Sequence, residues 1–171
     1  MQLLRSLLCS EPIEMRSPAE MILWSIAFPG FGQILNGRLL KGFVFLGLEF
    51  LINVNANINQ TILFSFLGET EKAFETANYQ WILFYPCVYV FAIWDAYRDA
   101  GGAASRYSFL PSVFSAYCGT IGVLYSPVFT FFSLTLGPIW LGILGMLIGA
   151  AVGLAIKTCL PANSHSHQNL N

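Results

Sequence analysis

The composition of this chain of 171 residues excludes most soluble proteins, because 56% of its residues are hydrophobic and only 10% are charged. A soluble domain of ordinary composition carries roughly 25% charged residues, and so short a chain forms one small domain that still exposes much of its surface. The net charge of −1 leaves no basic surface for a nucleic acid, so the expected partner is the lipid bilayer.

Two segments come first along the chain. Residues 1–19 mix leucines with charged residues, which is compatible with a helix on the membrane surface or with a frayed terminus. Residues 20–36 are apolar but are interrupted by Pro29-Gly30-Phe31-Gly32. The uninterrupted part, residues 21–28, is too short to cross a bilayer alone. This segment is therefore either a kinked span or a re-entrant half-helix.

The middle of the chain contains two further apolar segments. A turn with cations at residues 37–42 precedes a helix expected over residues 43–58. A short apolar run at 61–68 and an acidic extramembrane loop follow, and then a segment at 81–97 with an expected kink at Pro86. Aromatic residues near the ends of this last segment are typical interfacial anchors.

The C-terminal part contains the clearest membrane signal. Residues 107–156 are 50 residues without Asp, Glu, Lys, Arg or His, between Arg106 and Lys157. One span needs roughly 20 apolar residues. The stretch therefore predicts two helices, over residues 112–132 and 136–156, joined by a tight turn, before a polar tail.

These segments predict an all-α fold, a polytopic membrane bundle of five hydrophobic helices, with four helices plus one re-entrant segment as the alternative. The expected organisation is a surface segment at 1–19, a membrane domain at 20–100, a transmembrane hairpin at 101–156 and a flexible tail at 157–171.

The run from Phe28 to Arg38, which reads FPGFGQILNGR, is followed by Lys41-Gly42, an apolar helix and later Trp94-Asp95. This pattern over residues 20–100 resembles the two-transmembrane-helix domain family of small bacterial membrane proteins. The resemblance implies a helical hairpin and supplies no catalytic residue. The commoner family pattern has a His-Arg-Phe-Tyr-like stretch after the glycines, where this chain has Gln-Ile-Leu-Asn.

Polar residues at the ends of three segments are expected to meet at one membrane face. If the second and third segments run antiparallel, the beginning of one lies beside the end of the other. We expect Asp95 within salt-bridge distance of one of the cations. The favoured interpretation is a structural ion cluster, and the alternative is a site for an anionic lipid headgroup. The residues concerned are Gln33, Asn36, Arg38, Lys41, Asp95 and Arg98.

Glu49 is the one ionisable residue well inside a predicted span, about 12 Å deeper than Lys41 at the rise of an α-helix. Asn53 and Asn57 follow at intervals of one turn and would extend a polar stripe. Intramembrane carboxyl groups usually face the bundle interior and are functional candidates. The simpler interpretation is a protonated Glu49 that is hydrogen-bonded to Asn53 or to a neighbouring helix, and the alternative is a path for protons or cations along Glu49, Asn53 and Asn57.

Small residues recur at helical spacing on both C-terminal helices. Such faces allow two helices to approach closely. We expect the two helices to pack on each other, with homo-oligomerisation through the same residues as the alternative. The residues are Gly142, Gly145, Gly149 and Gly153 on the last helix, and Ser115, Gly119, Gly122 and Ser126 on the helix before it.

The sequence contains no recognisable pattern of a catalytic or metal-binding site. The four cysteines lack the spacing of a metal site or disulfide framework. The only histidines, His165 and His167, lie in the tail, so neither a catalytic triad nor a metal site is expected. We expect no enzyme and no cofactor.

The leading functional hypothesis is a non-enzymatic structural, assembly or regulatory component of a membrane. The alternatives are a small transporter or ion-conducting oligomer that uses Glu49, Asn53 and Asn57, and a protein that binds lipid headgroups at Arg38, Lys41 and Arg98.

The distribution of Lys and Arg predicts the orientation, because cytoplasmic loops carry the excess. Five spans place five cations on one side against Arg5, Arg16 and Lys72 on the other, whereas re-entry of residues 20–36 makes the count seven against one. The length of that segment and the family resemblance favour five spans. With either topology, we expect the cytoplasmic side to hold the C-terminal tail and Arg38, Lys41, Arg98, Arg106 and Lys157.

Overall fold

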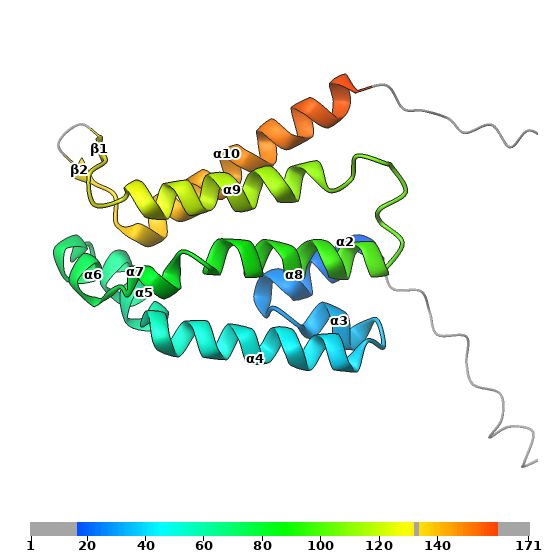
Figure 1. Ribbon diagram of the computed structural model, residues 1–171, viewed down its shortest axis with the longest axis horizontal. Coiled ribbons are helices and arrows are strands. Elements are labelled where there is room, and N and C mark those ends of the chain that lie inside the picture. The colour runs from blue at the N-terminus through cyan, green and yellow to red at the C-terminus, as the bar shows by residue number, and fades with distance from the viewer. Residues whose placement is uncertain (1–16, 132–133, 161–171) are drawn as a thin grey trace, which may run out of the picture.

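The computed structural model describes residues 17–131 and 134–160. The surface segment up to residue 16, the tail from residue 161, and Arg5, Arg16, His165 and His167 lie outside this part of the chain. The fold is all-α, as expected, apart from two strands of two residues each that pair in a loop. Helices α4, α8, α9 and α10 run side by side along the long axis (Figure 1).

The elements follow one another as short and long helices. In chain order they are α2 (Pro18–Ala27), α3 (Phe31–Leu35), α4 (Leu39–Ala56), α5 (Ile58–Phe66), α6 (Thr70–Thr76), α7 (Tyr79–Ile82), α8 (Tyr85–Asp99), α9 (Leu110–Tyr125), β1 (Thr130–Phe131), β2 (Leu134–Thr135) and α10 (Pro138–Cys159).

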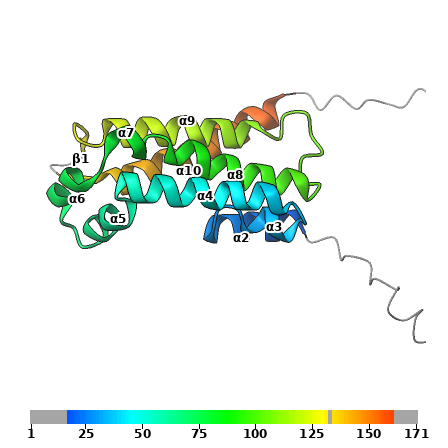
Figure 2. The ribbon, with the colours of Figure 1, turned by 60° about the horizontal axis from the view of Figure 1, so that its bottom comes forward.

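Residues 20–36 form a helical hairpin rather than a kinked helix. Helix α2 ends before Pro29, and Gly30 adopts a left-handed conformation with φ 101°, which a side chain would disfavour. The chain then reverses, so that Gly32 of α3 lies directly against Met21 and Ser25 of α2. Figure 2 shows both helices at the end of the bundle where α4 begins.

The α2–α3 hairpin reaches only part of the way along α8. Gly32 and Met21 lie at the level of Ala96, whereas Ile26, near the far end of α2, accepts a hydrogen bond of 2.7 Å from the Tyr89 hydroxyl. From residue 96 to residue 89 an α-helix rises about 10 Å. The hairpin therefore turns back within the bundle instead of continuing along α8.

Helix α4 lies antiparallel to α8. Lys41 at its beginning contacts Asp95 and Asp99 at the end of α8, and Glu49 further along contacts Tyr85 at the beginning of α8. Helix α4 ends at Asn57, which has φ 55°, a left-handed conformation that asparagine tolerates. A core at this end joins α4, α5 and α7 through Ile52, Ala56, Ile58, Ala77, Ile82 and Val123.

The expected kink at Pro86 is instead a break between two helices. Helix α7 ends at Ile82, and α8 begins at Tyr85 with Pro86 in its first turn. Proline is tolerated in a first turn because the missing N–H would have no partner within the helix there.

Helices α9 and α10 form the expected hairpin, but its connection is longer than a tight turn. Helix α9 ends at Tyr125, earlier than expected, because Pro127 has no backbone N–H to donate to the carbonyl of Val123 one turn before it. Helix α10 begins at Pro138, so residues 126–137 form the connection.

Glycines bring the backbones of α9 and α10 into contact. A Cβ atom at Gly145 would collide with the carbonyl of Cys118, at Gly149 with that of Phe114, and at Gly153 with that of Leu110, while Gly122 lies equally close to Leu141. Gly119 contacts Met146, and Gly142 contacts Val123. The small faces expected from the sequence therefore meet within one chain.

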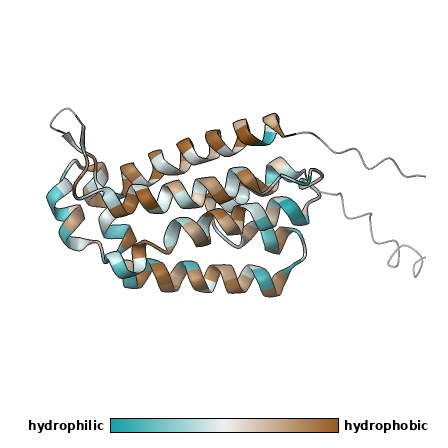
Figure 3. Cartoon of the chain, turned by 45° about the horizontal axis from the view of Figure 1, so that its top comes forward, coloured by the Kyte–Doolittle hydropathy of each residue, from teal (hydrophilic) through white to brown (hydrophobic). Residues whose placement is uncertain are grey.

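Among the described residues, two helices are long and apolar enough to cross a membrane: α4 with 18 residues and α10 with 22 residues. Helix α9 is apolar but shorter. Figure 3 shows hydrophobic residues along the long helices and hydrophilic residues near the ends of the bundle.

Gly149→Leu is expected to lower the free energy of unfolding by about 3 kcal/mol, because the new side chain must push the backbone of Phe114 away. Thermal unfolding in detergent, followed by circular dichroism, measures this loss. Gly47→Leu is the matched control, since a Cβ at Gly47 meets nothing within 4 Å, and we expect a change within about 0.5 kcal/mol. Equal stability of the two variants would contradict the close packing.

Candidate functional sites

The ion cluster at one end of the bundle joins α4 and α8. Lys41 Nζ lies 3.0 Å from Asp95 Oδ1 and 2.7 Å from Asp99 Oδ2. Arg98 extends the cluster, with one guanidinium nitrogen 2.6 Å from Asp95 Oδ1 and 3.5 Å from Asp99 Oδ1. The expected ion pair of Asp95 is thus present, to Lys41 and Arg98 together.

Two amides attach the α2–α3 hairpin to the same end of α8. Gln33, which is fully buried, donates to the Ala92 carbonyl at 2.7 Å and to Asp95 Oδ2 at 3.4 Å. Asn36 donates to the Ala96 carbonyl at 2.9 Å. These bonds explain why a short helix such as α3 holds its position.

Arg38 takes part in the cluster only at its edge. Its Nε lies 3.9 Å from Asp99 Oδ2, and 66% of its side chain is exposed. Arg98 is also partly exposed, and its guanidinium lies 4.6 Å from the centre of the Trp94 ring. The six residues expected to converge therefore do so, with Arg38 as the least engaged.

Asp99 is a member of the cluster that the sequence analysis missed. Its signal is the spacing of one helical turn from Asp95, which places both carboxylates on one face. Lys41 and Arg98 both lie within salt-bridge distance of Asp99, and Arg38 reaches it at 3.9 Å. The two carboxylates therefore bind the same pair of cations, Lys41 and Arg98.

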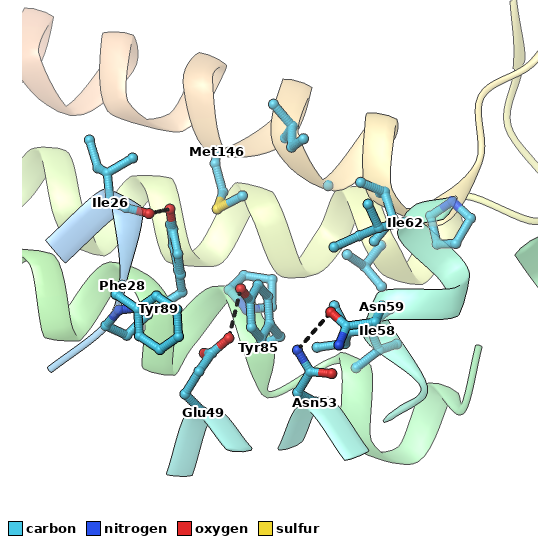
Figure 4. Close-up of a pocket in the computed structure, with 18 of the residues that line it drawn as sticks. Ile26, Phe28, Glu49, Asn53, Ile58, Asn59, Ile62, Tyr85, Tyr89 and Met146 are labelled. Atoms are coloured by element: carbon cyan, nitrogen blue, oxygen red, sulfur yellow. Dashed lines mark hydrogen bonds between the residues drawn. The ribbon is translucent and has the colours of Figure 1, made fainter. Parts of the chain in front are cut away.

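A second candidate site is a cavity of about 610 Å³ between α4, α5, α8, α10 and the tip of the α2–α3 hairpin. We call it the Glu49 cavity. Its walls are mostly aliphatic and aromatic, and the polar side chains come from Glu49, Asn53, Asn59, Tyr85 and Tyr89. Figure 4 shows these side chains facing the same space.

Glu49 has one engaged and one free oxygen. Oε1 accepts a hydrogen bond of 3.2 Å from the Tyr85 hydroxyl. Oε2 is buried and has no hydrogen-bond partner among the described residues. Leaving a buried acceptor unpaired costs about 1–3 kcal/mol, so the cavity favours a donor at this position.

The predicted polar stripe is only partly present. Asn53 lines the Glu49 cavity and donates to the amide oxygen of Asn59 at 3.2 Å. Asn57 has left the helix and donates to the Thr76 carbonyl at 3.1 Å. The stripe was expected to continue because α4 was predicted to extend to residue 58. Asn59 replaces Asn57 as the neighbour of Asn53 in the cavity. The sequence did not predict this position, because it results from the reversal of the chain at Asn57.

The small residues at the α9–α10 contact have no polar site of their own. Ser115 is buried against α10 beside Gly149. Ser126 is fully buried beyond the end of α9, where its hydroxyl donates to the Val123 carbonyl at 2.7 Å and lies 3.0 Å from the Tyr79 hydroxyl. Ser115 therefore serves the packing of α9 on α10, whereas Ser126 connects the end of α9 to Tyr79 of α7.

Comparison of the chain with models of protein families, with curated proteins and with solved structures gave no match.

Asp95→Asn is expected to lower the free energy of unfolding by about 2–3 kcal/mol, because it removes one of the two charges that hold Lys41 and Arg98. Glu71→Gln, on the exposed surface of α6, is the control and should cost less than about 1 kcal/mol. Unfolding in detergent measures both. An Asp95→Asn protein as stable as the control would show that the cluster is dispensable.

Proposed function

We propose that this chain is a non-enzymatic integral membrane protein that acts as a structural, assembly or regulatory component. The observation that carries the proposal is the apolar outer surface of α4 and α10. Leu40, Phe50 and Leu147 are 81%, 71% and 64% exposed. Only 22% of the most apolar window of either helix is buried, so neither is the core helix of a soluble protein, and lipid is the solvent that accepts such surfaces.

The proposed topology has four crossing segments, namely α4, α7 with α8, α9 and α10, and one re-entrant hairpin, α2–α3. Helix α9 has 16 residues, which rise about 24 Å, so adjoining loop residues complete its crossing. Arg98 and Lys157 close the same end of the bundle at which Lys41 begins α4, whereas Lys72 lies on α6 at the opposite end (Figure 1). This distribution supports a cytoplasmic location for the first end.

The packing surfaces of the chain support the proposed structural role. The glycine face of α10 is covered by α9 of the same chain, so a second copy or another membrane protein would have to contact a different, aliphatic face. We further propose that α4 and α8 correspond to the two helices of the two-transmembrane-helix family that residues 20–100 resemble.

Transport or ion conduction is the second candidate, favoured by the free Oε2 of Glu49 in a cavity. The departure of Asn57 from the stripe removes one step of the path that this candidate needs. Headgroup binding by the three cations has less support, because Lys41 and Arg98 are bound by carboxylates and only Arg38 is largely free.

Cysteine accessibility in intact cells tests the topology. After replacement of the native cysteines, single cysteines at positions 12, 105 and 158 should resist an impermeant thiol reagent, whereas one at position 71 should react. All four should react after the membrane is opened. Labelling at position 12 in intact cells would favour five spans, and labelling at 105 or 158 would overturn the orientation.

Reconstitution into liposomes that contain a pH-sensitive dye separates the two candidate functions. The structural proposal expects the wild-type protein to pass protons no faster than empty liposomes. Proton flux that Glu49→Gln abolishes, and that Glu75→Gln on α6 leaves unchanged, would replace the structural proposal with the transport candidate.

A further inference from the structure

The Glu49 cavity is open to the outer surface of the bundle. The most exposed of its large apolar lining residues are three: Phe28 is 55% exposed, Phe50 is 71% exposed and Val54 is 57% exposed. They belong to the hairpin tip and to α4, the helix with the apolar outer face. A molecule dissolved in the hydrocarbon of a bilayer could therefore enter from the side without crossing a polar surface.

The size of the cavity suits a small organic molecule. A volume of about 610 Å³ lies inside the range of about 300–1,000 Å³ that is usual for such sites. The walls include Ile58, Ile62, Ile143 and Met146 in addition to Phe28, Phe50 and Val54. A ligand with an apolar body is thus favoured.

The polar groups of the cavity determine which polar group of the ligand can bind there. The hydroxyl of Tyr85 is bound to Glu49, that of Tyr89 to the Ile26 carbonyl, and the amide of Asn53 to Asn59. Among the buried polar atoms of the described residues that line the cavity, Oε2 of Glu49 is left without a partner. Because it belongs to a carboxyl group, it accepts hydrogen bonds most strongly from a donor that is itself positively charged.

Aromatic rings beside this carboxyl group favour an ammonium group over other cations. The Tyr85 and Tyr89 rings are stacked, with centroids 5.4 Å apart and planes at 27°, and Figure 4 shows both near Glu49. Aromatic faces attract organic cations. A divalent metal needs several oxygen ligands, and the described residues contain no group of three or more His, Cys, Asp or Glu that could hold one.

We infer that the Glu49 cavity binds a small apolar molecule that carries a protonated amine, with the amine at Glu49 Oε2 and the apolar body against α10 and the hairpin tip. Binding forms a charge-assisted hydrogen bond to the free oxygen and leaves the Tyr85 bond in place. The inference goes beyond the proposed structural function and does not depend on it.

The test uses the full chain in nanodiscs of phosphatidylcholine, which has no net charge, with 9-aminoacridine as a flat cationic probe and anthracene as a neutral probe of similar shape. Probe fluorescence is corrected with empty nanodiscs. Wild-type protein should bind both probes saturably. Glu49→Gln should weaken binding of 9-aminoacridine by about tenfold or more and leave anthracene binding unchanged, and Glu71→Gln should alter neither.

A second variant locates the probes without changing the carboxyl group. Ile62 lines the cavity and is 36% exposed, so Ile62→Trp can fill the space with little effect on folding and should weaken binding of both probes. The inference is overturned if 9-aminoacridine does not bind saturably, if Glu49→Gln binds it as tightly as wild type does, or if Ile62→Trp leaves its binding unchanged. These results do not bear on the cysteine accessibility that tests the membrane topology.

Discussion

The contact between Lys41 and Asp95 is the interaction on which the N-terminal half of the structure depends. Asp95 is 3% exposed and accepts bonds from Lys41, Arg98 and Gln33, so one carboxylate joins α4, α8 and the α2–α3 hairpin. A buried charge of this kind is tolerated only when it is paired and fully hydrogen-bonded. Lys41 and Arg98 provide the opposite charge, and the buried Gln33 amide helps to orient the carboxylate.

The C-terminal half is held together by a different force. Between α9 and α10 no ion pair is present in the described residues, and the backbones touch through glycines. Dispersion and close packing act over the whole length of this contact. The Glu49 cavity lies where the two halves meet, because bulky residues such as Met146 of α10 face Tyr85 and Glu49 across a space that neither kind of packing fills.

Much of this arrangement was predictable from local patterns. Glycines at a spacing of four residues predicted the α9–α10 contact, and antiparallel segments with charged ends predicted the pairing of Asp95. Helix ends were less predictable, because Pro127 and the left-handed Asn57 end helices that hydropathy alone would extend. The position of Asn59 and the depth of the α2–α3 hairpin depend on how segments pack on each other, which no local pattern contains.

The distance in sequence between Gln33 and its partners on α8 affects when the two halves can assemble during synthesis. Gln33 and Ala92 are 59 residues apart, so the α2–α3 hairpin leaves the ribosome long before its binding surface exists. During that interval Gln33 and Lys41 lack the partners that α8 later supplies. The α9–α10 hairpin, whose contacts are formed between consecutive helices, can assemble as soon as its second helix emerges. Maturation of the two halves would thus be limited by different events, the arrival of a distant helix in one and the closure of a local turn in the other.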